Sequence, residues 1–210
     1  MILQYNKGIT FTLAKIISIV FHPLFMPLYG LGIIFTAPTL LEYLPAEVKK
    51  VLVLIILVNN IIIPVTLLHL LRNRNLINSY NIEERGERVV PLILVSFLYS
   101  ITSYMVFRYQ IPVFLKAFIL ASTLLVISVT IINLWWKISI HAVAAGALVS
   151  VVIILSIKMY SPLTSYLVAT ILAGGLILSS RLKLNSHNPS QVWFGFFTGL
   201  SGLMLFISLI

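Results

Sequence analysis

The chain has 210 residues, of which 60% are hydrophobic and only 9% carry a charge, and its mean hydropathy is +1.09. This composition excludes an ordinary soluble globule, and several apolar runs approach the roughly 20 residues that cross a bilayer as a helix. The net charge of +9 does not indicate a nucleic-acid partner, because the cations lie scattered at the ends of apolar runs, as is typical of membrane flanks.

The first apolar stretch leads into two prolines. Residues 8–21 are mostly apolar and run into His22-Pro23-Leu24-Phe25-Met26-Pro27. Prolines four residues apart kink or end a helix. We therefore expect an interfacial helix over 8–23, followed by a first true span over about 24–41.

The rest of the chain alternates between apolar spans and short polar connections. The second span, over about 51–71, contains Asn59-Asn60, and amides at membrane depth usually hydrogen-bond across helices. Further spans are predicted over about 89–108, 112–134, 138–158, 163–180 and 191–210. We predict a single all-α domain over 1–210, a polytopic membrane bundle of about six to seven transmembrane helices.

Two polar clusters interrupt the middle of the chain. The first runs from Glu83 to Arg88, and its Arg85 and Arg88 are three residues apart, so they share one face of a helix. Alone, this cluster also fits a salt-bridged loop beside the membrane. The second follows two tryptophans typical of a headgroup belt and contains Ser139 and His141. A lone histidine of this kind is equally compatible with a structural role.

The third cluster, residues 180–191, is the longest polar interruption of the C-terminal third. Asn188, Pro189 and Gln191 have the spacing of an N-cap, a first-turn proline and a capping-box glutamine. His187 is then expected just outside the positive end of the last helix, where an anion is favoured. Arg181 is expected at the end of the preceding helix. A fixed cation, an imidazole and a helix N-terminus together suit a phosphate.

The predicted topology brings the three clusters to one side of the membrane. They lie between spans two and three, four and five, and six and seven, counted from the span over 24–41. Even-numbered connections all emerge on the same side. The clusters are therefore free to converge into one site.

These residues resemble the type 2 phosphatidic acid phosphatase (PAP2) superfamily over about residues 73–205. Ser180-Arg181, five residues, His187, three residues and Gln191 match the motif Ser-Arg-x5-His-x3-Asp except at the last position. Ser139 and His141 match the Ser and His of Pro-Ser-Gly-His. Arg85 or Arg88 stands where the arginine of Lys-x6-Arg-Pro is expected. The residues in and around the three motifs are similar to those of a compact PAP2-like branch of Bacteroidetes-type bacteria.

The chain departs from the family pattern in all three motifs. Asn78 and Asn81 stand where the lysine of the first motif is expected. Two isoleucines, at 138 and 140, replace the proline and glycine of the second, and Gln191 replaces the aspartate of the third. These departures affect the expected catalytic efficiency more than the expected binding of phosphate.

The resemblance implies a multi-pass, metal-independent lipid phosphatase of the bacterial inner membrane that uses no cofactor. His187 would be the nucleophile, His141 the general acid and base, and Gln191 would occupy the position of the orienting aspartate. The phosphate-binding residues would be Arg181, Ser139, Ser180, Arg85 and Arg88. The implied substrate is a phosphorylated lipid such as phosphatidate, phosphatidylglycerophosphate or undecaprenyl diphosphate, with no nucleic acid as partner.

A second function stays open at this stage. A catalytically degenerate protein of the same architecture would bind or transport phosphorylated lipids without hydrolysing them. Both proteins would bind phosphate, but only the enzyme would release it. An intramembrane prenyltransferase is excluded, because it needs aspartate-rich Mg²⁺-diphosphate motifs and the chain has no aspartate.

Overall fold

The computed structural model describes residues 8–74 and 85–210, and its regular elements within these ranges are all helical. The α-helices are α1 (Ile9–Val20), α2 (Met26–Thr36), α3 (Ala46–Ile56), α4 (Ile63–Asn73), α5 (Val89–Phe107), α6 (Val113–Trp135), α7 (Ile140–Lys158), α8 (Thr164–Lys183) and α9 (Pro189–Leu209). Short 3-10 turns are η1 (Pro23–Phe25), η2 (Leu40–Tyr43) and η4 (Gly86–Arg88), and η3 (Leu57–Ile62) is π-helical.

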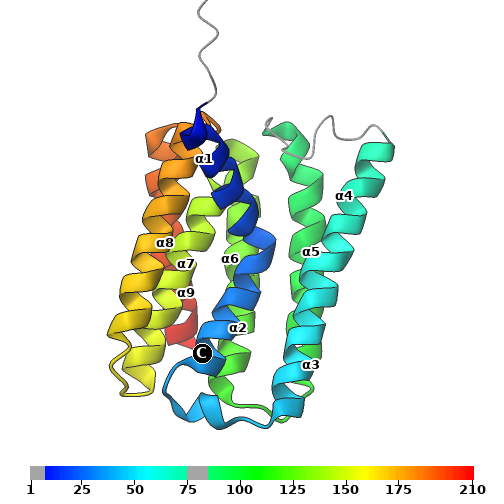
Figure 1. Ribbon diagram of the computed structural model, residues 1–210. Coiled ribbons are helices and arrows are strands. Elements are labelled where there is room, and N and C mark those ends of the chain that lie inside the picture. The colour runs from blue at the N-terminus through cyan, green and yellow to red at the C-terminus, as the bar shows by residue number, and fades with distance from the viewer. Residues whose placement is uncertain (1–7, 75–84) are drawn as a thin grey trace, which may run out of the picture.

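Seven helical segments in the described ranges are long and apolar enough to cross a membrane. The predicted all-α polytopic bundle is therefore confirmed, and the chain is a multi-pass membrane protein. Figure 1 shows the segments side by side, running alternately up and down. The end of α4, the start of α5 and the turns α6–α7 and α8–α9 lie at the end of the bundle where α1 begins (Figure 1, top). This end is called the site end below.

The N-terminal segment differs from the expected separate interfacial helix. The elements α1, η1 and α2 form one kinked segment, Ile9–Thr36, of 28 residues. Pro23 and Pro27 kink this segment without ending it, because each lies in the first turn of a helical element, where a missing N–H costs little. The segment also ends before the predicted residue 41, since Pro38 disfavours helical geometry at the residue before it.

The second span contains the π-helical turn η3 at its asparagine pair. The Thr102 hydroxyl donates a 2.6 Å hydrogen bond to Asn60 Oδ1, and Asn59 Nδ2 lies 3.3 Å from Met105 Sδ as a donor. Both partners are on α5. The expectation that these amides bond across helices is confirmed, and the wide turn is what lets successive asparagines both reach α5.

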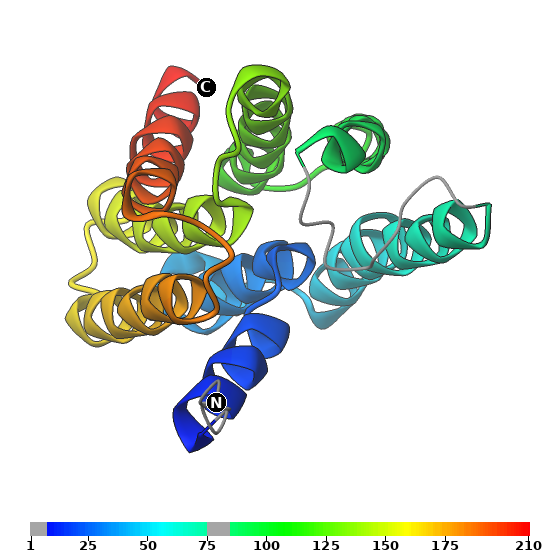
Figure 2. The same ribbon diagram turned by 90° about the horizontal axis from the view of Figure 1, so that it is seen from above.

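Helix α7 lies between α8 and α9, as the view from above shows (Figure 2). Its contact with α9 is backbone to backbone: a Cβ added at Gly199 would lie 1.8 Å from Val143 O, and one at Gly146 would lie 2.0 Å from Phe196 O. Glycine is required at such distances. Because Ser139 occupies the N-cap position of α7 and His187 immediately precedes the N-cap of α9, this contact fixes the second and third polar clusters relative to each other.

Candidate functional site

A cavity of about 220 Å³ lies between α2, α5, α6 and α7. Most of its lining side chains are apolar, and none is a carboxylate. Its cationic and imidazole groups, called the cavity's charged and imidazole groups below, are His22, Arg88, His141, Arg181 and His187. Positive groups at one end of an apolar cavity suit an anion that carries an apolar chain. Among the described residues, no group of three or more histidines and glutamates is placed to share a metal ion.

His187 is held by the capping box of α9. Asn188 Oδ1 accepts the Gln191 backbone N–H at 2.9 Å, and Gln191 Oε1 accepts both the Asn188 N–H at 3.4 Å and His187 Nδ1 at 2.9 Å. A backbone N–H can only donate, so the side-chain atom facing it is the amide oxygen. His187 Nδ1 therefore carries the proton, and the lone pair is on Nε2. This is the tautomer that a nucleophilic imidazole needs.

The surroundings of His187 also keep its imidazole in the neutral form that a nucleophile requires. Burial lowers the pKa of His187 to about 4. The hydrogen bond that His187 donates to Gln191 opposes this shift, and the positive charges of Arg88, Arg181 and Lys137 lower the pKa further. The folded pKa lies below the ordinary 6.5, so the imidazole is neutral at neutral pH. Its side chain is 8% exposed.

Arg181 is oriented from the first span. Its Nη1 donates to Ser18 Oγ at 3.3 Å, and Ser18 Oγ lies 3.2 Å from Ser180 Oγ. Ser180 already donates its hydroxyl proton to Ile177 O at 2.7 Å. The Ser18 hydroxyl therefore donates to Ser180 and accepts from Arg181. Ser180, predicted to bind phosphate, lies outside the cavity lining and instead joins α8 to α1.

His141 is also held from α1. Its Nε2 lies 3.2 Å from Ser18 O. A carbonyl can only accept, so Nε2 carries a proton and Nδ1 is the nitrogen left for chemistry. The His22 ring packs edge-on against His141, with ring centroids 5.4 Å apart.

The two candidate arginines of the first cluster lie in different environments. Arg88 is buried, lines the cavity and has Nη1 3.5 Å from Ile138 O. Arg85 is exposed, and its Nη1 donates to Leu134 O at 2.7 Å, at the end of α6. The structure thus brings Arg88 to the site and gives Arg85 a bracing contact outside it. Glu83 and Glu84 of this cluster and the motif positions Asn78 and Asn81 lie outside the described residues.

Ser139 is fully buried beside the site and does not line the cavity. Its backbone N–H donates to Gln191 O at 3.3 Å, which ties α7 directly to the start of α9. Its hydroxyl has no hydrogen-bond partner among the described residues. A buried hydroxyl without a partner is costly. Ser139 therefore offers an unused hydroxyl donor close to the start of α9.

Two site residues were not found from the sequence. Ser18 and His22 both belong to the segment that was expected to be interfacial. The available signal was the polar dipeptide His22-Pro23 at a predicted kink, since a histidine at a break in a span faces the bundle rather than lipid. Ser18 gave no signal, because one serine in an apolar helix is common.

Fold and site together define a multi-pass helical membrane protein with a mostly apolar cavity that holds two arginines and three histidines. A scan of protein-family models, a search of curated proteins and a search of solved structures each found no match to this chain.

Proposed function

We propose that the chain is a membrane lipid phosphatase that hydrolyses a phosphomonoester or diphosphate of a lipid through a phosphohistidine at His187. One observation carries the proposal: a neutral imidazole held by Gln191 shares an apolar cavity with the guanidinium groups of Arg88 and Arg181 and with His141. The resemblance of these positions to the PAP2 motifs supports the same chemistry. It also favours the bacterial inner membrane as the location.

In the first step, His187 Nε2 attacks the phosphorus and the P–O bond to the lipid breaks. The leaving oxygen takes a proton from Nδ1 of His141, which binds this proton together with the anionic substrate and keeps its Nε2–H on Ser18 O. His187 becomes a phosphorylated imidazolium, because Nδ1 keeps the proton that it donates to Gln191. The released product is the lipid alcohol, or a lipid monophosphate if the substrate is a diphosphate.

In the second step, water attacks the phosphorus and the P–N bond breaks. His141 Nδ1, neutral after the first step, takes the proton of this water. Orthophosphate leaves, and His187 regains its Nε2 lone pair. Arg88 and Arg181 neutralise the non-bridging oxygens in both steps, with fixed donors that need little reorganisation.

The lining of the cavity supports a lipid rather than a soluble phosphate ester. Apart from the cavity's charged and imidazole groups, the lining is mostly apolar. It includes Tyr99, Phe118 and Leu203, contributed by α5, α6 and α9. An acyl or prenyl chain would bury its surface there at about 25 cal/mol per Å². A hydrophilic ester would gain nothing from this surface.

The alternative is a protein that binds or transports phosphorylated lipids without turnover. The observation that favours it is Gln191: an amide orients His187 but does not offset the charge of the imidazolium that forms during attack. Anion binding by Arg88 and Arg181 would be unaffected. Both functions therefore include binding of the lipid phosphate, but only the enzyme releases phosphate.

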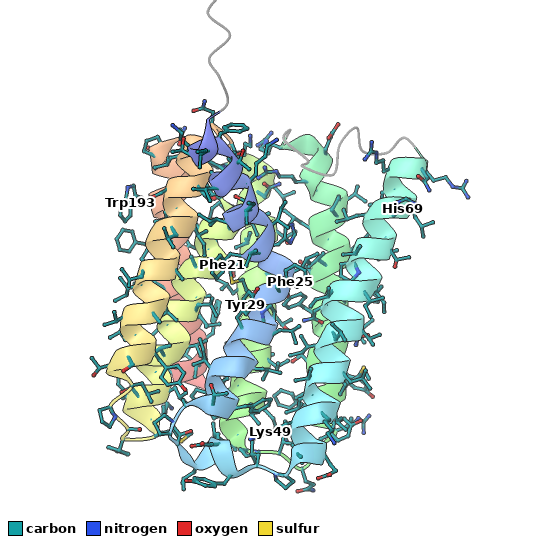
Figure 3. The ribbon with its side chains drawn as sticks, viewed as in Figure 1. Phe21, Phe25, Tyr29, Lys49, His69 and Trp193 are labelled. Carbon is teal, nitrogen blue, oxygen red and sulfur yellow. The ribbon has the colours of Figure 1, made fainter. Side chains whose placement is uncertain are left out.

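The test is orthophosphate release by the detergent-purified protein from phosphatidate, phosphatidylglycerophosphate and undecaprenyl diphosphate. We expect release from at least one lipid, inhibition by orthovanadate, and persistence in EDTA. His187→Asn should abolish release, whereas His69→Asn, a histidine at the same end of the bundle but outside the cavity lining (Figure 3), should not change it.

Equal background release by wild type and His187→Asn would contradict the enzyme and leave the lipid-phosphate binder. Loss of activity in EDTA that Mg²⁺ restores would contradict the metal-independent mechanism.

A further inference from the structure

The kink of the first span places one histidine in the cavity with a fixed orientation. His22 is the N-cap of η1, and its Nδ1 accepts the Leu24 backbone N–H at 3.3 Å. Across the kink, the Tyr29 hydroxyl donates to Val20 O at 2.9 Å. Phe21, Phe25 and Tyr29 lie around this bend (Figure 3). The backbone at His22 is therefore fixed from both sides.

This geometry determines which ring nitrogen of His22 is available. The Leu24 N–H can only donate, so Nδ1 is the acceptor and the proton of the neutral ring is on Nε2. Nε2 has no hydrogen-bond partner among the described residues. The ring lines the cavity, whose lining contains two guanidinium groups and no carboxylate. A donor among cations needs an acceptor, and the cavity lining supplies no anionic one.

We propose that His22 is a further binding residue of this site and that its Nε2–H donates a hydrogen bond to a phosphate oxygen of the lipid substrate. The inference rests on the proposed function. It assigns the first span a direct part in the site: His22 binds the phosphate, while Ser18, one turn earlier, orients Arg181 and His141. None of the three motifs that resemble the PAP2 family includes this span.

Two substitutions distinguish the roles of the two ring nitrogens of His22. In His22→Asn, the amide oxygen replaces Nδ1 as the cap acceptor, since asparagine is among the best N-caps, and the distal donor is lost. In His22→Gln, the amide nitrogen reaches the position of Nε2, and the cap is weakened. His69→Asn is the matched control, because it makes the same change at a histidine outside the cavity lining.

The measurements are the dissociation constant of orthovanadate and the KM and kcat for phosphatidate in mixed micelles, with the corresponding diacylglycerol as a competitor that lacks the phosphate. We expect His22→Asn to weaken orthovanadate binding and raise KM by about tenfold, as for loss of a hydrogen bond to a charged group. His22→Gln should retain binding within about threefold of wild type, and binding of diacylglycerol should not change in either variant.

Three results would overturn the proposal. If His22→Asn binds orthovanadate as wild type does, His22 is no ligand, and the proposed function stands if wild type still releases phosphate. If both variants weaken binding equally, His22 acts only on the shape of the kink. If wild type neither binds orthovanadate nor releases phosphate from any lipid, this inference and the proposed function fail together.

Discussion

One amide, that of Gln191, connects the start of the last helix to the imidazole beside it. Its oxygen closes the capping box and holds His187 Nδ1 at 2.9 Å, so the residue is at once a structural cap and the partner of the proposed nucleophile. An amide fixes the tautomer without stabilising the positive charge that attack creates. We therefore expect Gln191 to limit the rate of the proposed hydrolysis.

Gln191→Glu tests that limit at constant side-chain length. The carboxylate keeps both hydrogen bonds and stabilises the imidazolium, so phosphate release should rise about tenfold, which corresponds to roughly 1.4 kcal/mol of barrier. Gln191→Asp should give a smaller gain, because it is one methylene shorter. Gln191→Leu, which cannot hold Nδ1, should lose release. The measurement is the initial rate on one lipid, and a Glu variant no faster than the Leu variant would refute the role.

The depressed pKa of His187 predicts how stability depends on pH. Because burial lowers its pKa to about 4 in the fold, against 6.5 in an unfolded chain, only the unfolded chain binds this proton between those values. The contribution is fully present above about pH 6.5 and is lost as the pH falls toward 4. Over this window, the melting temperature of wild type should fall more steeply than that of His187→Asn in the same detergent. Parallel curves would show that His187 titrates normally.

At the scale of elements, the contact between α7 and α9 keeps the two halves of the site together. Gly199→Ala would place a Cβ 1.8 Å from a backbone oxygen of α7, and backbone cannot move aside as a side chain can. We expect destabilisation at or above the usual 1–3 kcal/mol of overpacking, measured as a lower melting temperature, with loss of phosphate release.

Gly175→Ala is the control for this substitution. It lies on the exposed face of α8 with nothing within 4 Å of an added Cβ, so alanine should be neutral or slightly stabilising. If Gly199→Ala melts at the same temperature as Gly175→Ala, the close packing of α7 on α9 is wrong.

The apolar pattern of the sequence predicted the membrane spans better than the kinks and contacts that connect them. The apolar lengths alone are sufficient for the bundle, and the capping box at Asn188 is visible as local chemistry. The continuous segment through Pro23 differs from the expected pair of separate elements, because the sequence pattern is the same whether a proline ends a helix or bends one that continues. The contacts of Ser18 with Arg181 and His141 join residues more than 120 positions apart, which no local pattern records.

At the scale of the whole molecule, the alternation of spans is what assembles the site. Three connections far apart in the sequence emerge at one end of the bundle, and their Arg88, His141, Arg181 and His187 line one cavity (Figure 1). Of the predicted residues, Arg85 and Ser180 brace neighbouring helices instead, and Ser139 lies behind the lining. The catalytic roles of the residues that do converge stay predictions.

The most direct test of these roles is a search for the covalent intermediate. The purified protein is mixed with ³²P-labelled lipid phosphate and quenched in alkali within milliseconds to seconds, because a phosphohistidine is stable in alkali and labile in acid. Our account predicts protein-bound label that is lost on acid treatment, is absent from His187→Asn and persists in His69→Asn. Phosphate release by wild type without any labelled protein, or label that remains in His187→Asn, would contradict it.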